Sequence, residues 1–496
     1  MTILSDATLT SIEHAVPGPR YDRARVTPGI VHFGVGNFHR AHEAVYLDDL
    51  MNQGEAHEWG ICGVGVLAQD VRMRDALAAQ DGLYTLVLRH SDGRLEPRVI
   101  GSIVKYLFAP DDPWGVVDQL ADPAIRIVSL TVTEGGYNNH PVTGRFDVEN
   151  AAILEDARAE IPSTVFGFIV AGLRRRRTEG TPPFTVMSCD NIQENGNVAR
   201  AALIAFAGLA DRELADWIDA NVAFPNSMVD RITPVTTAQD LALVEKTYGI
   251  VDLWPVLSEP FRQWVLQDSF TDGRPPFQLA GVQLVPDVMP YELMKLRLLN
   301  VSHQALAYFG YLAGFRFTHE AVGDPDIRDF VRGYMDLDAT PTLLPVPGID
   351  LEAYKDQLLE RFSNPEVRDT LARLCADTSN RIPKWLVPVV TSNLGAGGHV
   401  VLSAAIIASW ARYAEGMDEQ GRAIDVVDPL ADALGSRARA YPDDQLAFLR
   451  APDLFGDLAT NDAFVAPYLR VLRLLHAHGA AATLRELRTD DQFRAG

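Results

Sequence analysis

The chain has 496 residues, which is too long for one ordinary hydrophobic core and predicts two or three domains. Hydrophobic residues make up 47% of the chain and charged residues 22%, the balance of a soluble globular protein. Acidic residues outnumber basic ones by 66 to 44, and the net charge of −22 disfavours binding to nucleic acid or to an anionic membrane surface.

The cysteines and the apolar runs indicate the cellular compartment. Cys62, Cys189 and Cys375 are widely spaced and form no C-x-x-C pair. This set argues against a disulfide framework and a zinc knuckle, and it fits a reducing compartment. The N-terminal segment lacks a basic region followed by an apolar core, and the run "VVLSAAIIASWA" is too short to span a bilayer. We therefore expect a cytoplasmic protein with no membrane segment.

The first half of the chain alternates apolar runs with helix-like segments. Buried strands are predicted at "GIVHFGVG", "WGICGVGVL", "RIVSLTVTEGGY" and "FTVMSCDNI". Helices are predicted between them at "VRMRDALAAQ" and "VFGFIVAGLRRRR". Strands that alternate with helices indicate a parallel sheet of βαβ units.

The segment "GVGNFHRAH", residues 34–42, lies where the first strand turns into a helix. Gly34 lets the chain turn, and Gly36 lets the backbone approach a pyrophosphate at the helix N-terminus. His39 stands where the usual fingerprint has a third glycine, so G-x-G alone is a weak signal. The strand–turn–helix context is what favours a dinucleotide site. The candidate cofactor-binding residues of this turn are Gly34, Val35, Gly36, Asn37, Phe38 and Arg40. We expect Asn37 to cap the helix and Gly54 to end it.

Three charged residues leave alternatives open around this turn. Arg40 could reach a phosphate or face water. Asp70, after the second strand, could accept a hydrogen bond from a ribose 2′-hydroxyl, which favours NAD. Arg72 could instead accommodate a 2′-phosphate, which favours NADP. We expect NAD, with NADP as the alternative.

The same turn offers residues of the metal-ligand type. His39 and His42 are three residues apart, and Glu43 follows. This spacing is compatible with metal ligands, but a phosphate site explains the turn better. We expect no metal.

Near residue 285 the pattern changes to long helical segments, among them "LEAYKDQLLERFSN", "VRDTLARLCADT", "HVVLSAAIIASWARYAEGM" and "VAPYLRVLRLLHAHG". We therefore expect an α/β Rossmann-type dinucleotide-binding domain with a parallel-sheet core over residues 1–285. A mainly α-helical substrate and catalytic domain should follow over residues 286–496.

The segment "LMKLRLLNVSHQALAY", residues 293–308, carries polar residues in an otherwise apolar run. On an α-helix of about 100° per residue, His303 lies about 80° and Asn300 about 140° from Lys295. Apolar residues occupy every side, which is typical of a buried helix. A buried lysine has a lowered pKa and can act as a general base; the alternative is a structural lysine whose stem reaches solvent. Lys295 and His303 are roughly 12 Å apart along a straight axis, so they converge only if a substrate spans the gap or the helix is irregular.

Four separated motifs carry a resemblance to a known family: "VHFGVGNFHRAHEAVYLDDL", "SCDNIQENGNVAR", "FPNSMVDRITP" and "KLRLLNVSHQALAY". In this order they resemble the polyol-specific long-chain dehydrogenases, and the resemblance covers nearly the whole chain. It is strongest to the members that interconvert D-mannitol and D-fructose. Members that oxidise D-arabinitol or reduce fructuronate and tagaturonate share much of the pattern. The resemblance implies a metal-independent, NAD(P)-dependent oxidation of a secondary alcohol by a monomer or weak homo-oligomer.

The resemblance also implies roles for individual residues. Lys295 matches the catalytic lysine, and Asn191, Asn300 and His303 match residues that bind substrate oxygens. Further matches are Asp230 and Arg373 as polyol-binding residues, joined by Arg381 or Lys384, and Glu292 as a proton relay. The two asparagine amides would form an oxyanion hole. Without the family, Asn191 could cap the next helix, and Asp230 and Arg231 could form an ordinary surface pair.

Overall fold

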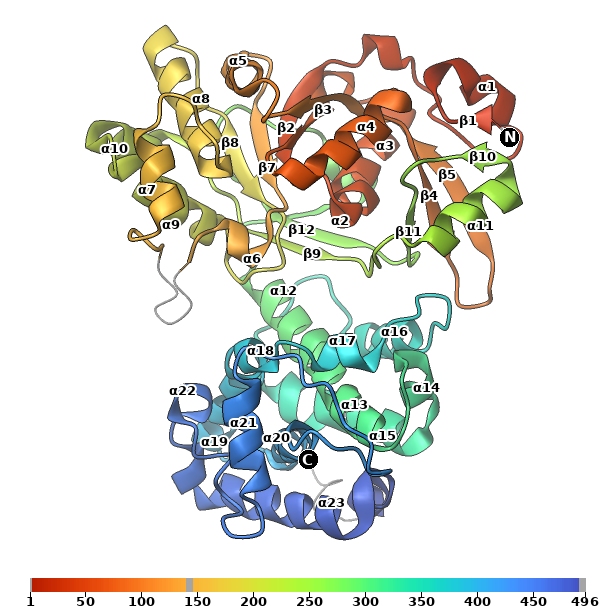
Figure 1. Cartoon of the computed structure of the whole chain (residues 1–496), viewed down its shortest axis with the longest axis vertical. Coiled ribbons are helices and arrows are strands. Elements are labelled where there is room, and N and C mark those ends of the chain that lie inside the picture. The colour runs from red at the N-terminus through yellow and green to blue at the C-terminus, as the bar shows by residue number, and fades with distance from the viewer. Residues whose placement is uncertain (1, 140–145, 490–496) are drawn as a thin grey trace. The chain divides into compact units, whose positions relative to one another are not determined.

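The structure is a computed structural model that describes residues 2–139 and 146–489. The chain forms two compact units, Met1–Met289 and Pro290–Gly496 (Figure 1). The first unit contains all the β-strands that the structure describes, and the second is built from helices.

The core of the first unit is a five-stranded parallel sheet with the order β6-β3-β2-β7-β8 (Figure 1). Its strands are β2 (Pro28–Phe33), β3 (Gly60–Gly65), β6 (Ile103–Phe108), β7 (Ile127–Leu130) and β8 (Thr185–Ser188). With β2 as strand 1, this is the order 3-2-1-4-5, which matches the first five strands of the Rossmann order 3-2-1-4-5-6. The four strands expected from apolar runs are confirmed. The edge strand β6 was not predicted. Most of its residues are half exposed, so it lacks a continuous buried apolar run.

Helices and further strands cover both faces of this sheet. One hydrophobic cluster joins it to α5 (Pro113–Ala121), α8 (Val165–Glu179), α9 (Asn195–Gly208) and α10 (Arg212–Asn221). A second cluster joins the opposite face to α3 (Glu43–Asn52), α4 (Val71–Ala79), β4 (Tyr84–Arg89), β11 (Val256–Ser258) and β12 (Gln263–Gln267). The parallel strands are therefore buried on both faces, which explains their apolar composition.

The remaining elements of the first unit are five strands and five α-helices among the residues that the structure describes. The strands are β1 (Thr2–Ile3), β5 (Leu95–Ile100), β9 (Ser227–Asp230), β10 (Ile250–Val251) and β13 (Gln283–Val285). The helices are α1 (Leu9–Ile12), α2 (Asn37–Ala41), α6 (Thr133–Gly136), α7 (Ala151–Arg158) and α11 (Ala238–Tyr248). The strands form three small sheets: β1-β10, β11-β4-β5 and β13-β12-β9.

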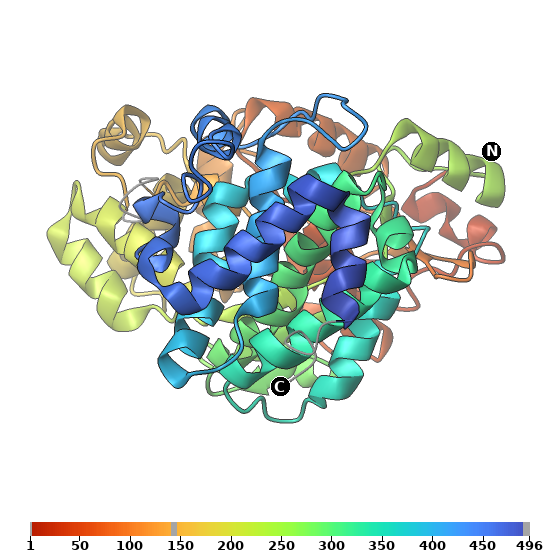
Figure 2. The ribbon, with the colours of Figure 1, turned by 90° about the horizontal axis from the view of Figure 1, so that it is seen from below.

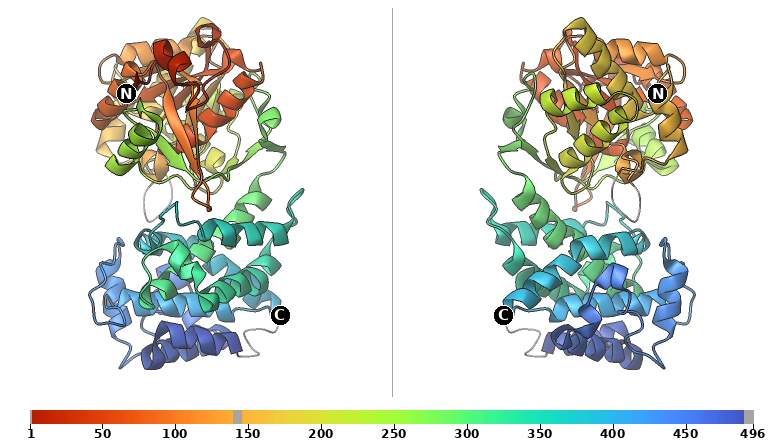
Figure 3. Two further views of the ribbon diagram at one scale, coloured as in Figure 1. Left: turned by 90° about the vertical axis from the view of Figure 1, so that its right-hand side faces the viewer. Right: turned by 90° about the vertical axis from the view of Figure 1, so that its left-hand side faces the viewer.

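The second unit has no β-strand among the residues that the structure describes between 290 and 489 (Figures 2 and 3). It begins within α12 (Met289–Met294) and continues with α13 (Val301–Leu312), α14 (Thr318–Gly323), α15 (Pro325–Gly333), α16 (Leu351–Phe362), α17 (Leu371–Cys375), α18 (Thr378–Trp385), α19 (Val387–Ala396), α20 (Val401–Ala414), α21 (Ala431–Arg439), α22 (Pro452–Phe455) and α23 (Asp462–Thr489). Helix α13 packs against α14, α15, α17 and α20, and α23 bends at Gly479.

Two π-helical turns interrupt the helices of the second unit. They span Lys295–Asn300, between α12 and α13, and Tyr334–Ala339, directly after α15. The expectation of a regular α-helix over residues 293–308 is therefore wrong for its central part. π turns are rare and occur frequently at functional sites.

Among the described residues, no helix combines the length and the apolar character that a membrane crossing requires. All three cysteines are buried and free, so the expectation that they form no disulfide framework is confirmed.

Candidate active site

The glycine turn after β2 leaves its backbone open at the start of a helix. Gly34 has a φ of 94°, and a Cβ there would lie 2.1 Å from the carbonyl oxygen of Thr131, so the position accepts only glycine. Gly36 is exposed, and a Cβ there would find no atom closer than the Gly34 oxygen at 3.7 Å. No side chain caps α2, which begins directly after Gly36. The turn therefore presents open backbone at a helix N-terminus.

Asn37 and Arg40 hold this turn in place rather than facing solvent. The expectation that Asn37 caps the helix is wrong: Gly36 is the cap residue, and the Asn37 amide donates to Pro234 O and Thr236 Oγ1, each at 2.9 Å. Arg40 is fully buried, so the alternative in which it faces water is wrong. Its guanidinium donates to Asn37 Oδ1 at 2.8 Å and to the carbonyl of Trp254, and burial lowers its pKa to about 10.

Val35, Phe38 and His42 pack around the turn. Val35 is buried, and a Cβ added at Gly63 of β3 would lie 2.7 Å from the Val35 side chain. The ring of Phe38 stacks on that of His42 with a centroid distance of 4.9 Å. The chain leaves the helical conformation at His42, so one expected helix is in fact two, α2 and α3. It ends near Gly54, which has a φ of 88°.

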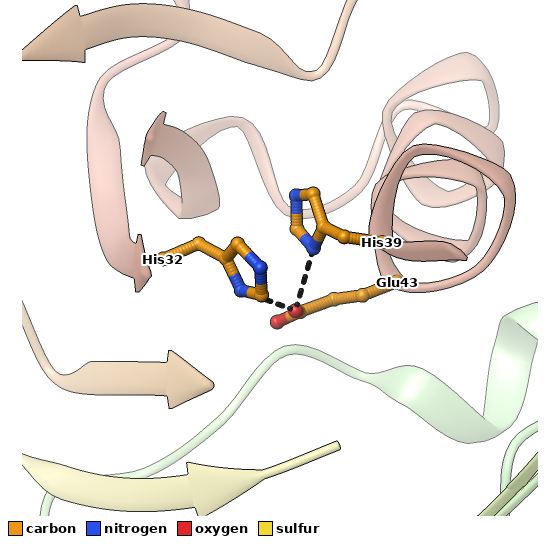
Figure 4. Close-up of side chains that lie close together, drawn as sticks. All are labelled: His32, His39 and Glu43. Carbon is orange, nitrogen blue, oxygen red and sulfur yellow. Dashed lines mark ion pairs between the residues drawn. The ribbon is translucent and has the colours of Figure 1, made fainter. Parts of the chain in front are cut away.

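His32, His39 and Glu43 form a buried cluster beneath the glycine turn (Figure 4). One carboxylate oxygen of Glu43 lies 3.2 Å from Nδ1 of each histidine, and the histidine rings stack at 3.4 Å. Burial opposes the charge of Glu43, but the two histidines outweigh it and hold the pKa of Glu43 below its usual range. Burial lowers the pKa of His39 to about 4.

This trio has the residue types of a metal site but a poor geometry for one. Nδ1 of His32 lies 2.8 Å from Ser129 Oγ and Nε2 lies 3.0 Å from Thr131 Oγ1, so both nitrogens already have hydroxyl partners. The lone pairs of two stacked rings lie in parallel planes and do not converge on one ion. His42 does not join the trio: its Nε2 lies 3.0 Å from the carbonyl of Gln263. The His39 ring, which stands where the usual fingerprint has its third glycine, packs α2 on His32 of β2.

Asp70 and Arg72 follow β3, as expected from the sequence. Asp70 Oδ2 accepts hydrogen bonds from the backbone N–H groups of Val66 and Leu67, both at 2.9 Å, and so fixes the turn at the end of the strand. The guanidinium of Arg72 lies 5.3 Å from the ring of Trp254. Asp70 thus lies directly after β3, and its contact with a ribose stays a prediction.

The first unit also holds Asn191 and Asp230. Asn191 is exposed in the loop after β8, and the alternative in which it caps the next helix is wrong because the cap residue of α9 is Glu194. Asp230 ends β9 and is buried. Arg231 is also buried and donates to the backbone carbonyls of Ala41 and Glu259, so a surface pair with Asp230 is excluded.

In the second unit, the π turn places Lys295 and Asn300 on one side of the helix. The N–H of Val301 donates to the carbonyl of Leu296, five residues back, so residues five apart stack above one another. At α-helical spacing the same two side chains would lie about 140° apart. His303 follows Asn300 by three α-helical residues and therefore shares this face. The irregular helix thus removes the angular separation of Lys295 and Asn300 that regular α-helical spacing implied.

Two of the polar groups on this face, those of Lys295 and Asn300, are withdrawn from water. Lys295 is 6% exposed and Asn300 is 5% exposed. Nδ2 of Asn300 has no hydrogen-bond partner among the residues that the structure describes. Because leaving a buried donor unsatisfied costs about 1–3 kcal/mol, such a group is expected to meet a ligand oxygen. The ring of His303 lies 4.6 Å from that of Phe362.

The other expected residues of the second unit are less enclosed, except Glu292. Glu292 lies on α12, one turn before Lys295, and is buried. Arg373 on α17 is exposed and binds Asp369 through two hydrogen bonds of 2.6 Å. Arg381 on α18 is half-buried and donates to the carbonyl of Leu374, whereas Lys384 is exposed.

Sequence reasoning missed the π turn itself. The one signal for it is the five-residue interval between Lys295 and Asn300, since polar residues at that interval share a face only when a turn contains an extra residue. The hydrogen bonds that Arg297 of this turn makes with Tyr334 and Thr342 join segments far apart in the sequence, so no local pattern indicates them.

The fold and these polar groups together define a two-domain protein with a Rossmann-type dinucleotide-binding domain and a helical domain that carries a buried lysine. Residues 28–279 match the mannitol dehydrogenase Rossmann domain, and residues 287–473 match the mannitol dehydrogenase C-terminal domain. The chain belongs to the mannitol dehydrogenase family.

Individual relatives agree over nearly the whole chain. A mannitol 2-dehydrogenase of Phaeosphaeria nodorum is 45% identical over 97% of this chain and 85% of its own length. The Pseudomonas fluorescens mannitol 2-dehydrogenase, solved as a ternary complex with NAD and D-mannitol, is 45% identical with a TM-score of 0.87, covering 99% of this chain and 100% of that one. A D-sorbitol dehydrogenase solved in substrate-free form is 40% identical with a TM-score of 0.91, covering 97% of this chain and all of that one.

Proposed function

We propose that this chain is an NAD-dependent polyol dehydrogenase that oxidises D-mannitol to D-fructose. The observation that carries the proposal is the buried face of the π turn, which combines Lys295 with Asn300, whose Nδ2 has no hydrogen-bond partner in the described part of the chain. A non-catalytic dinucleotide sensor would have no use for a buried amine and a buried free donor on one helix face. The similarity to mannitol 2-dehydrogenases over nearly the whole chain supports the choice of substrate.

The glycine turn fits the cofactor. Gly36 leaves open space above the backbone, and the uncapped start of α2 offers N–H groups to a pyrophosphate. Asp70 would accept a hydrogen bond from the ribose, which favours NAD over NADP. When bound, NAD supplies a nicotinamide carbon that accepts a hydride.

The side chains of this protein would handle the proton and the charge on oxygen. Lys295, in its neutral form, takes the proton from the substrate hydroxyl, and as an ammonium ion it returns a proton to the ketose in the reverse reaction. The amides of Asn191 and Asn300 donate hydrogen bonds to the oxygen as negative charge develops on it. His303, Asp230 and Arg373 are the candidates for holding the other hydroxyl groups. Glu292 is the candidate for relaying the proton to solvent.

D-Sorbitol is the second candidate substrate, because a D-sorbitol dehydrogenase is similar to this chain over almost its whole length. The two hexitols differ only in configuration at C2, and oxidation of either one there gives D-fructose. The remaining alternatives are D-arabinitol, fructuronate and tagaturonate. A uronate substrate requires a cation for its carboxylate, and Arg373 and Arg381 are the candidates for that role.

The test is the appearance of NADH at alkaline pH with D-mannitol, D-sorbitol and D-arabinitol, with NADP⁺ run in parallel. We expect the highest kcat/KM for D-mannitol with NAD⁺. A higher value for D-sorbitol would replace the substrate and keep the mechanism. Inactivity with every polyol, together with reduction of fructuronate or tagaturonate, would overturn the polyol assignment.

A further inference from the structure

Arg297 lies in the middle of the first π turn and has lost a regular helical hydrogen bond. In an α-helix its carbonyl would accept from the N–H of Val301, four residues later. In this structure the N–H of Val301 donates to the carbonyl of Leu296 instead. The formation of the π turn therefore removes the usual donor of the Arg297 carbonyl, and a carbonyl inside a helix needs a replacement donor.

The hydroxyl of Tyr334 supplies a donor to this carbonyl. Tyr334 is fully buried, and its hydroxyl donates to the carbonyl oxygen of Arg297 at 3.2 Å. Burial raises the pKa of Tyr334 well above its usual value, so the hydroxyl keeps its proton and remains a donor. The guanidinium of Arg297 also donates to the carbonyl of Thr342. Both the backbone and the side chain of Arg297 are thus tied to the segment 334–342.

This supporting segment is itself held firmly. Tyr334 begins the second π turn, and two acidic residues of that turn are pinned from outside it. Asp336 forms ion pairs with Lys355 and Arg332. The fully buried Asp338 pairs with His399, and its other carboxylate oxygen accepts from the N–H and the hydroxyl of Ser403. The Asp336 pairs are partly exposed, whereas the Asp338 contacts are buried, and buried polar contacts of this kind rigidify a structure.

We propose that Tyr334 is a positioning residue that holds the first π turn open, so that Lys295 and Asn300 stay on one face of the helix. The inference rests on the proposed function, because it assigns Tyr334 the task of aiming the base and the oxyanion donor. Without this hydrogen bond, the turn can relax toward α-helical spacing and move the two side chains apart. Misplacement of reacting groups by about 1 Å can cost up to about 100-fold in rate.

The test is the variant Tyr334→Phe, which removes only the hydroxyl. We expect kcat to fall about tenfold or more, with KM for NAD⁺ unchanged and a larger primary deuterium isotope effect on kcat with D-mannitol deuterated at C2. A loss of folded protein alone would lower the apparent kcat without changing the isotope effect. The matched control is Tyr468→Phe in the same unit, where the buried hydroxyl has no hydrogen-bond partner among the described residues. This control should behave as the wild type.

Two further variants make the result decisive. Arg297→Gln weakens the tie to Thr342. Like Tyr334→Phe, it should lower kcat and raise the isotope effect. If Tyr334→Phe does not fold, this second variant tests whether the segment 334–342 positions the π turn. If Tyr334→Phe folds and keeps the wild-type kcat and isotope effect while Lys295→Ala is inactive, the positioning role of Tyr334 is overturned. Wild-type turnover in Lys295→Ala would instead overturn the proposed function on which the inference rests.

Discussion

The glycine turn after β2 and the π turn after α12 present polar groups in opposite ways. The glycine turn offers backbone N–H groups, and it works because Gly34 and Gly36 carry no side chains. The π turn offers side chains, and their directions depend on which backbone groups of the helix are hydrogen-bonded. Changes in the glycine turn should therefore act on folding or cofactor affinity, whereas changes in the π turn should act on the chemical step.

The largest effect is expected from Lys295→Ala in the π turn. Loss of the general base should lower kcat by about 10²–10⁴-fold, because the amine that takes the substrate proton is gone. NADH affinity should remain nearly intact, since the glycine turn is untouched. Steady-state kinetics and a fluorescence titration with NADH measure the two quantities. An unchanged kcat would remove Lys295 from the mechanism.

The two glycines should separate folding from cofactor binding. Gly34→Ala should destabilise the first unit, by about 1–2 kcal/mol from the left-handed backbone alone and further from the clash with Thr131. Gly36→Ala should leave the thermal unfolding midpoint unchanged, because its φ of −99° and the open space tolerate a methyl group. It should weaken NADH binding about tenfold, roughly 1.4 kcal/mol. Equal NADH affinity for Gly36→Ala and the wild type would contradict a pyrophosphate site at this turn.

Acid should destabilise the first unit through the histidines that follow the glycine turn. Burial lowers the pKa of His42 from 6.5 to about 3 and that of His39 to about 4. Below pH 6.5 the unfolded chain binds protons on these histidines that the folded chain does not. Their contribution to the free energy of unfolding is therefore fully present above pH 6.5 and is lost as the pH falls toward the folded pKa values of about 4 and about 3. In His42→Phe the pH slope of the free energy of unfolding should become shallower by up to about 1.4 kcal/mol per pH unit. Denaturant unfolding at several pH values, followed by tryptophan fluorescence, tests this; an unchanged slope would refute it.

The smallest effect is expected from chelation. EDTA should leave activity unchanged, because the ring nitrogens of His32 already have hydroxyl partners and the proposed chemistry needs no ion. The measurement is kcat after prolonged dialysis against EDTA. A loss of activity that zinc restores would return the trio of His32, His39 and Glu43 to the list of candidate metal ligands.

The two regions also differ in how far the sequence reveals them. Four strands of the main sheet and the glycine turn could be predicted, because buried parallel strands carry continuous apolar runs and glycines mark the turn. The burial of Arg40 could not, since its acceptor Trp254 lies 214 residues away. The π turn could not either, because one of its supports, Tyr334, lies 37 residues after Arg297. Local spacing reports helix and strand, whereas such irregularities depend on distant hydrogen bonds.

The central claim is that Lys295 and Asn300 act on the same substrate oxygen from one face of the π turn. The most direct test is a double-mutant cycle of Lys295→Ala and Asn300→Ala on the single-turnover rate of D-mannitol oxidation. The matched control is Ser302→Ala, since that hydroxyl is also buried and without a hydrogen-bond partner in the described chain; it should leave the rate unchanged. The account predicts that the double variant loses far less than the product of the two single losses, because residues that act as a unit are not additive. Independent, multiplicative losses would contradict it.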